Sequence, residues 1–500
     1  MTTGLTSQTI VIGIGRFLNI AVAAGTLMIL ARVLPDKVSY GAVSQIIMLY
    51  MVLSQIFSVG LPQSTYYFLP RYEGGERRGF VFQTILLLML SGSVLGAGMY
   101  FGADALGRLL GNAMLPDLLR IFAVYPFFML PTLAVEGTLL HAKRPVATVL
   151  FNSLIRVGMF GALVIPSVLH VSLAQTLRIW MGVGAIMWVA AVLLMLSTVR
   201  GLPLVWRRDM LKDEWAFSLP LAGVTLLTIA AYNIDRFLVS NTFGAAAFGI
   251  YANAAIDIPT VTTVTTAVST VLMAEFSRRV ALGEMKELLE IWHRAITRSA
   301  VLIFTSLGFL AFWAHETMRL LFSERFAESG VIFSVFVWII PLKLIAAQSL
   351  FVALGATRVL TGITAFGLVM GAIFVYSGGQ LFGLPGMAVG SVLTGYLNMS
   401  LAVYYLSSRL TDIGLRHFLP WRRIGMVLLM ALAAGAISRG LFWLGMRHWP
   451  MLAAYCVALI VFLLCYTAGL SLLHMHHLLI PSRLLRRFQR STSPADETMA

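Results

Sequence analysis

About fourteen apolar stretches, each long enough to cross a membrane, account for nearly all of this 500-residue chain. A helix needs roughly 20 apolar residues to cross the ~30 Å hydrocarbon core of a bilayer. Hydrophobic residues make up 59% of the chain, against about 45–50% in soluble domains. The sequence therefore predicts an all-α, polytopic integral membrane protein that works inside the membrane. The expected spans are 10–34, 42–69, 80–102, 118–140, 147–168, 178–198, 215–242, 247–275, 299–320, 331–353, 359–381, 387–408, 424–446 and 451–473.

The charges predict the orientation of these spans. The net charge is +15, but only 11% of the residues are charged, and the basic ones lie mainly in the loops. About 23 of them fall on the side that holds both termini and about 7 on the other. Because cytoplasmic loops carry the excess of Lys and Arg, both termini are expected in the cytoplasm, and no nucleic-acid partner is expected. The first segment has no positive charge before it and is long for a signal peptide, so no cleavable signal is expected.

One loop between spans has a helical pattern of its own. Between Glu284 and Arg294, the apolar residues Met285, Leu288 and Trp292 recur at helical spacing on one face. This pattern predicts an amphipathic helix on the cytoplasmic membrane surface. The loops on the opposite side are short, which argues against a catalytic domain there.

The chain also contains a weak internal repeat. Tyr40-Gly41 and Phe248-Gly249 both stand at the entry to a span and are 208 residues apart, and the same offset brings Arg71 onto Arg279. Six spans separate the copies, so the two halves have the same orientation, as in parallel-repeat transporters. We therefore expect two pseudo-symmetric six-helix lobes plus two extra C-terminal helices. The expected parts are 1–200 for the first lobe, 201–410 for the second, 411–475 for the extra pair and 476–500 for a basic cytoplasmic tail.

These motifs resemble a known family. The stretch from Ala31 to Pro35 with Tyr40-Gly41 is similar to the first-helix ending of bacterial polysaccharide flippases. Asp235, followed by the residues from Gly244 to Ala254, resembles their seventh-to-eighth helix signature. These flippases belong to the multidrug/oligosaccharidyl-lipid/polysaccharide exporter superfamily. At Pro35 the family more often has Gly followed by Pro, a difference that concerns loop shape.

The resemblance implies a function. It implies translocation of undecaprenyl-diphosphate-linked oligosaccharides across the bacterial cytoplasmic (inner) membrane by alternating access. The number of spans and the length look more like the exopolysaccharide members than the O-antigen members. The implied partners are the lipid-linked oligosaccharide, membrane lipids, a polysaccharide polymerase and a chain-length regulator.

Polar residues inside the spans are the candidates for a substrate site. A charged residue at mid-bilayer costs roughly 2.5–3.5 kcal/mol on insertion scales, so such residues normally face protein or water. Cations prevail among them, which suits a diphosphate headgroup because guanidinium and ammonium groups bind phosphate oxygens. The substrate-binding candidates are Arg16, Asn19, Arg156, Asp235, Arg236, Asp257 and Lys343.

Several of these residues have a structural alternative. Arg16 lies near the cytoplasmic end of its span, where its side chain could reach the interface. Arg236 and Asp257 could form a structural ion pair between neighbouring spans, as readily as they could bind substrate. Both alternatives stay open on the sequence.

The sequence bears on the energy source of transport and on two alternative functions. No Gly-x-x-x-x-Gly-Lys-Ser/Thr loop for nucleotides is present, so transport is expected to use an ion gradient, the membrane potential or downstream consumption. No cofactor or metal is expected, and the coupling ion, a proton or sodium, stays open. A cation-coupled drug or metabolite exporter on the same fold is the first alternative. A membrane glycan polymerase or ligase is the second, although an enzyme is not expected.

Overall fold

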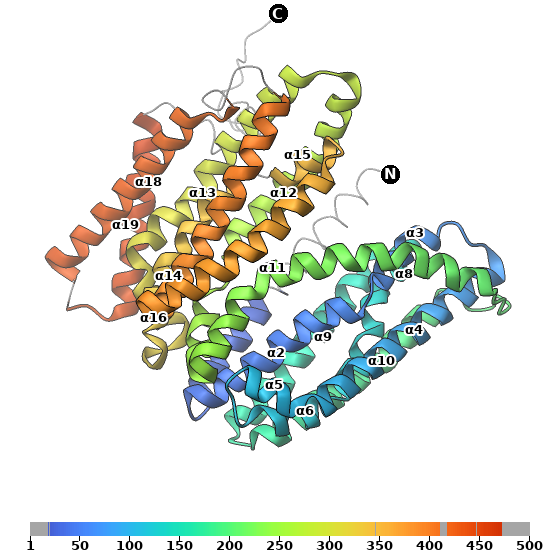
Figure 1. Ribbon diagram of the computed structural model, residues 1–500. Helices are drawn as coiled ribbons and strands as arrows, with labels where there is room; N and C mark the ends of the chain where they lie inside the picture. Colours follow the sequence, from blue (N-terminus) through green and yellow to red (C-terminus); the bar gives the residue numbers. More distant parts are fainter. Residues whose placement is uncertain (1–18, 20, 346, 411–417, 447, 473–500) are drawn as a thin grey trace, which may run out of the picture. The chain divides into compact units, whose positions relative to one another are not determined.

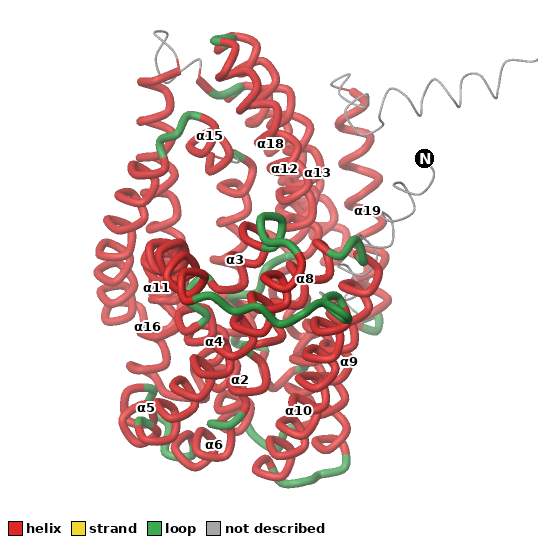
Figure 2. Tube along the Cα trace, turned by 90° about the vertical axis from the view of Figure 1, so that its right-hand side faces the viewer, coloured by secondary structure: helices red, strands yellow, loops and turns green. Residues whose placement is uncertain are grey.

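The described part of the chain is helical throughout. The computed structural model describes residues 19, 21–345, 347–410, 418–446 and 448–472. Within these ranges it contains helices and loops and no strand, as Figure 2 shows. A bilayer offers no water to backbone groups, so a spanning chain satisfies its N–H and C=O groups within helices. The predicted all-α class is confirmed.

The chain is a multi-pass membrane protein. Ten helices in the described ranges are long and apolar enough to cross a membrane, and a bent pair, Leu115–Phe122 with Tyr125–His141, raises this number to eleven. A shorter apolar helix, Ala21–Val33, precedes them. The exact number of spans, expected to be about fourteen, stays a prediction.

Two helices are each long enough to hold two of the expected spans. Helix α11 (Arg208–Ala254) has 47 residues and α16 (Thr357–Leu410) has 54. At 1.5 Å per residue each is about 70 Å long or more, over twice the hydrocarbon thickness. Each contains one break, at Gly244 (φ 76°) and at Gly383 (φ 63°). Glycine suits both positions because it adopts positive φ without a steric penalty. The breaks lie between the expected spans in both cases.

The helices group into two compact units. The first unit holds the described residues up to Asn253 with Leu321–Phe326 and Gly371–Met387, and the second holds the rest. The elements of the first unit are α2 (Lys37–Phe57), α3 (Leu61–Phe68), α4 (Gly74–Phe101), α5 (Ala103–Leu109), α6 (Leu115–Phe122), α7 (Tyr125–Met129), η1 (Pro131–Ala134), α8 (Val135–His141), α9 (Pro145–Val168), α10 (Leu173–Ser197), η2 (Glu324–Phe326) and α11 as far as Asn253.

The second unit follows α11. Its elements, apart from its parts of α16, are α12 (Pro259–Leu282), α13 (Met285–Phe322, as far as Leu320), α14 (Ser329–Phe336), η3 (Val337–Leu344), α15 (Ala347–Ala353), α18 (Trp421–Leu441), η4 (Phe442–Met446) and α19 (Met451–Leu472).

Three expected spans, 42–69, 118–140 and 247–275, are interrupted where proline starts a new helical segment; in the last of them α12 begins at Pro259. The expected span 42–69 ends as α2 at Phe57, and α3 begins at Leu61 with Pro62 in its first turn, after Val59 (φ 50°) and Gly60 (φ 71°). The expected span 118–140 is divided into α6, α7, η1 and α8, the first three of which have a proline in the first turn. Proline lacks an N–H and clashes with the preceding turn, so it occupies helix starts.

The prediction of a separate surface helix at 284–294 is wrong. These residues form the beginning of α13, which continues to Phe322. The apolar stripe packs inside the second unit: Leu288 and Trp292 are fully buried, and Trp292 donates a 2.9 Å hydrogen bond to the carbonyl of Ile345. An amphipathic pattern shows that one face is covered and does not show whether lipid or protein covers it.

The repeated aromatic–glycine pairs meet in the first unit. A Cβ atom on Gly249 would lie 3.0 Å from the Tyr40 ring and 3.4 Å from Cα of Gly41. A Cβ atom on Gly41 would lie 1.9 Å from the carbonyl oxygen of Ala245. Glycine at both positions therefore lets α2 and α11 approach at backbone distance, which explains why both copies of the repeat carry it.

In the second unit, α18 and α19 pack side by side (Figure 1). Ser438 of α18 donates a 2.8 Å hydrogen bond to the carbonyl of Ala458. The hydroxyl of Tyr466 on α19 donates one of 2.8 Å to the carbonyl of Val301 on α13. Buried hydrogen bonds therefore hold the extra helix pair together and attach it to α13 of the second unit.

Candidate substrate site

Two of the predicted site residues form an ion pair in the second unit. Lys343 pairs with Asp257. Asp257 lies in the short non-helical segment between α11 and α12, two residues before Pro259. Lys343 lies in η3, two residues after Pro341. The two residues are 86 positions apart in the chain, so only the folded structure reveals the pair.

The Lys343–Asp257 pair is accessible. The side chain of Lys343 is 31% exposed and that of Asp257 is 72% exposed. The hydroxyl of Thr265 on α12 donates a hydrogen bond of 3.4 Å to the carbonyl of Lys343, which links η3 to α12. Broken helices at membrane depth are typical places for ligand sites, because they are tolerated where the backbone lines a cavity or is covered by protein. An anionic ligand could compete with Asp257 for the ammonium group.

A second polar group lies on α11 in the first unit. Asp235 accepts a hydrogen bond of 2.9 Å from the hydroxyl of Tyr251, and the guanidinium of Arg236 donates one of 3.4 Å to Asn233 Oδ1. Asp235 and Arg236 are both half-buried. The carboxylate is thus held by a buried tyrosine beyond the break at Gly244. The expected pair between Arg236 and Asp257 stays a prediction.

Arg156 occupies the middle of α9 and is exposed. No ion pair or hydrogen bond is formed by its side chain within the described ranges. Its charge acts on the buried hydroxyl groups of Tyr50 and Tyr125, and Tyr125 in turn accepts a 3.1 Å hydrogen bond from Trp180. A guanidinium group placed in this way is available to an anionic ligand.

Of the two site candidates in the expected span 10–34, Asn19 lies within the described residues. Asn19 is half-buried, and its Oδ1 has no hydrogen-bond partner in the part of the chain that the structure describes. Arg16 lies outside the described residues. The role of Arg16 in the site therefore stays a prediction.

The sequence did not reveal a buried amide cluster in the first unit. Gln45 of α2 donates hydrogen bonds to Ser240 of α11 (2.7 Å) and to the carbonyl of Leu110 (3.0 Å), and it accepts one from Asn112 (2.6 Å). Asn253 accepts a hydrogen bond from Tyr40. Gln45 and Asn253 are separated by the same 208 residues as the aromatic–glycine pairs, so the repeat was a signal that could have identified them.

Comparisons with known proteins agree with this architecture. A family model described as "Polysaccharide biosynthesis protein" matches residues 29–331. No curated protein matches the chain in sequence.

Solved structures with the same fold are transporters. The lipid II flippase MurJ in an inward closed conformation is similar with a TM-score of 0.74 at 14% identity, over 93% of this chain and 99% of that one. An inward-facing multidrug resistance MATE transporter of the MOP superfamily is similar with a TM-score of 0.62 at 14% identity, over 78% and 94% of the two chains. A MOP superfamily transporter from Pyrococcus furiosus gives a TM-score of 0.55 at 14% identity, over 80% and 94%.

The family model matches more than half of this chain, and the solved transporters share its fold. The chain is a multi-pass membrane protein with the fold of MOP superfamily transporters, and it belongs to the polysaccharide biosynthesis protein family.

Proposed function

We propose that this protein flips undecaprenyl-diphosphate-linked oligosaccharides across the bacterial cytoplasmic membrane for the synthesis of exopolysaccharide or another surface polysaccharide. The family is one of polysaccharide biosynthesis, and the fold is that of a lipid II flippase and of multidrug transporters. A flippase of this fold works by alternating access of two lobes, 1–200 and 201–410, with the pair 411–475 beside them and a basic tail at 476–500.

One observation carries the chemistry of the proposal: Arg156 is an exposed guanidinium in the middle of an apolar helix, without an acidic partner in the described ranges. Such a charge costs roughly 2.5–3.5 kcal/mol at mid-bilayer unless it faces water or an anion. A diphosphate headgroup provides that anion. Lys343 supplies a second cation, because its partly exposed ammonium group is paired with the exposed carboxylate of Asp257 in the second unit.

Export in cells tests the proposal. We expect Arg156→Ala and Lys343→Ala to abolish polysaccharide export while their abundance in the membrane stays at the wild-type level. Arg178→Ala is the matched control, since Arg178 is an exposed arginine near the start of α10. Its guanidinium can reach the interface, so export should persist. Normal export by both site variants would contradict the proposed site and direct attention to Arg16 and Arg236.

The remaining expectations belong to the same proposal. The protein sits in the inner membrane with both termini in the cytoplasm and acts together with a polymerase and a chain-length regulator. No catalytic group is assigned, and the coupling ion is a proton or sodium.

A cation-coupled exporter of soluble compounds is the second candidate. The half-buried carboxyl group of Asp235, held by Tyr251, favours it, because a carboxylate within a span can bind a coupling cation. An accumulation assay separates the two candidates: deletion of the gene raises the cellular content of a fluorescent cationic dye if the protein is a drug exporter, and leaves it unchanged if the protein is a flippase.

A further inference from the structure

A carboxyl group is buried where the first turns of α11 pack on α3 and α4. Glu214 has no exposed surface. Its Oε1 accepts hydrogen bonds from Ser64 (2.7 Å) and Thr84 (3.0 Å), and its Oε2 accepts one from the side-chain amide of Gln83 (2.8 Å). No lysine, arginine or histidine of the described ranges forms an ion pair with it. A buried carboxylate without a cation is costly, so the site needs an explanation.

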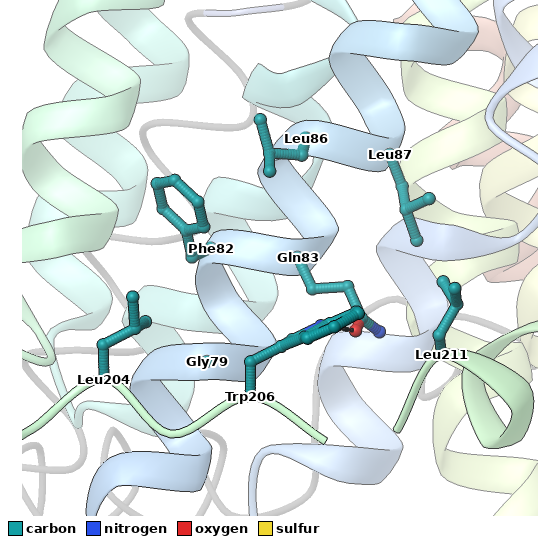
Figure 3. A pocket seen from close by; sticks show the side chains of 8 residues that line it. All are labelled: Gly79, Phe82, Gln83, Leu86, Leu87, Leu204, Trp206 and Leu211. Atoms are coloured by element: carbon teal, nitrogen blue, oxygen red, sulfur yellow. Dashed lines mark hydrogen bonds between the residues drawn. The ribbon is translucent and has the colours of Figure 1, made fainter. Parts of the chain in front are cut away.

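The partners of Glu214 are themselves fixed. The indole N–H of Trp206 donates a 2.7 Å hydrogen bond to Oε1 of Gln83, which directs the amide nitrogen of Gln83 toward Glu214. Figure 3 shows the ring of Trp206 beside Gln83, in a pocket lined by apolar residues of α4 and of the loop before α11.

The loop that carries Trp206 is docked on α4. The N–H of Val205 donates a 3.2 Å hydrogen bond to the carbonyl of Gly75, and Arg78 donates one of 2.6 Å to the carbonyl of Leu202. A Cβ atom on Gly79 would lie 2.0 Å from the carbonyl oxygen of Val205. The surroundings of Glu214 are therefore rigid and are built from four segments, α3, α4, the loop and α11.

The geometry accommodates two protonation states of Glu214. The hydroxyl oxygen of Ser64 lies 2.7 Å from Oε1 of Glu214 and also 2.7 Å from the carbonyl of Leu61. A hydroxyl has one hydrogen and can accept two. With an ionised Glu214, Ser64 donates to the carboxylate. With a protonated Glu214, the acid donates to Ser64, and Ser64 donates to Leu61. Thr84 and Gln83 donate in both states.

We propose that Glu214 is a proton-binding site and that its proton stabilises the docking of the first turns of α11 on α3 and α4. Burial penalises the charged form of the Glu214 carboxyl group more than the hydrogen bonds from Gln83, Ser64 and Thr84 favour it, so its pKa is raised, whereas water would stabilise the charge. The docked arrangement therefore binds the proton more tightly than an arrangement in which water reaches Glu214. Linkage then requires that the proton favours docking by the same factor. A rise in pH weakens the docking, and a fall strengthens it.

Only the biological role of this proton site rests on the proposed transport function: a proton-linked movement of α11 would couple a flippase to the proton gradient. The binding of the proton itself does not depend on which substrate is carried. Failure of one proposal therefore leaves the other intact.

Several other charged or titratable side chains surround Glu214. Burial, and then the negative charges of Asp213, Glu214 and Glu76, raises the pKa of Tyr72, which keeps this phenol neutral. Glu76 pairs with Arg207 at 2.8 Å. The other charged groups on the chain segments around the site are Arg71, Glu73, Arg77, Arg78, Arg200, Arg208, Asp209, Lys212 and Asp213. His141 of α8 lies near Arg77, and histidine is the side chain whose ordinary pKa is nearest to neutrality, so it needs its own control.

Infrared difference spectroscopy of the purified full-length protein tests proton binding directly. A pH change should produce the C=O stretch of a buried protonated carboxyl group, and Glu214→Gln should remove that band. Asp213→Asn, which changes the exposed neighbouring carboxyl group, and His141→Gln should retain it. A band that persists in Glu214→Gln, or no buried-acid band in the wild type at any pH at which the protein is folded, would overturn the proposal.

Spin labels test the linkage to docking. Labels on cysteines at the exposed positions Glu73 and Lys212 report the separation of the α4 start and α11, after Cys456 and Cys465 are replaced by serine. The population with the longer separation should increase as pH rises in the wild type. In Glu214→Gln, a neutral isostere that keeps the docked form, the distribution should be independent of pH. A distribution that moves with pH equally in both proteins would refute the linkage.

Discussion

The hydroxyl of Tyr251 donates a 2.9 Å hydrogen bond to Oδ2 of Asp235, across the break that Gly244 makes in α11. The two residues are 16 positions apart, one on each side of this break. Tyr251 is fully buried, and Asp235 is half-buried. The bond therefore ties the two arms of α11 together and orients one of the predicted site residues.

We expect Tyr251→Phe to lower the free energy of unfolding by about 1.5–3 kcal/mol, because it removes one hydrogen bond to a carboxylate and keeps the packing of the ring. The measurement is the thermal unfolding of the detergent-solubilised protein. Tyr232→Phe on the same helix is the control, since Tyr232 is 81% exposed. An equal loss in both variants would argue against a structural role for the Tyr251 bond.

The approach of α2 to α11 leads to a second expectation. Gly41→Ala places a methyl group on the carbonyl of Ala245, a backbone atom that cannot rotate away. Overpacking of this kind costs about 1–3 kcal/mol, so membrane abundance and unfolding temperature should both fall. Gly25→Ala is the control, because nothing lies within 4 Å of its added atom. Wild-type abundance of Gly41→Ala would show that the two helices separate easily.

A third expectation concerns Arg439 of α18. Its guanidinium pairs with Glu316 of α13 at 2.8 Å and lies 4.9 Å from the centre of the Trp313 ring. The side chains of Arg439 and Glu316 are 26% and 14% exposed, so Arg439→Leu leaves a poorly hydrated carboxylate and should cost up to about 3 kcal/mol.

A double variant separates the charge from the packing. Replacing Glu316 by leucine as well as Arg439 should restore much of the unfolding temperature, because no uncompensated charge remains. Arg120→Leu, in the more exposed pair with Asp104, should change it little. No recovery in the double variant would assign the loss to the contact with Trp313.

Acid should weaken the charged end of α12. Hydrogen bonds from Arg278, and then from Arg279, lower the pKa of Glu275 from 4.5 to about 2. A lowered carboxyl pKa contributes stability that is present above about pH 4.5 and is lost as the pH falls toward 2. Unfolding temperatures recorded across this range should fall less in Glu275→Gln than in the wild type. Glu287→Gln, at an exposed position on α13, should behave like the wild type, and identical profiles for all three would disprove the expectation.

The orientation in the membrane is tested by reporter fusions. Fusions after Arg78, Arg208 and Arg298 should report the cytoplasm, and fusions near Gly244 and Pro385 should report the outside. The comparison of Arg208 with Gly244 is the most direct one, because a single arm of α11 runs from Arg208 to the break at Gly244. Fusions at these two positions that report the same side would exclude a span between them.

The sequence predicted the fold class because hydrophobicity and helix formation are local properties. In a bilayer the length of an apolar stretch and the need to satisfy every backbone group leave a helix as the outcome. The sequence also contained a signal for the break before α3, because Pro62 stands inside the expected span 42–69. The aromatic–glycine pairs indicated a repeat, but the sequence did not show that the two copies would meet each other.

Tertiary structure decided which residues become partners. The sequence left Asp257 open as a partner of Arg236 or as a substrate ligand. Within its own unit it pairs with Lys343, which lies 86 residues away. The stripe with Trp292 was expected against lipid and is covered by protein, because amphipathicity leaves open what covers an apolar face.

Glu214 was not singled out by the sequence, because its three donors come from two other helices. The chain by itself therefore determined that it is a bundle of membrane helices with cations inside. The three-dimensional packing determined which of these charges are paired, buried or open to a ligand, because those properties depend on distances between segments that are remote in sequence.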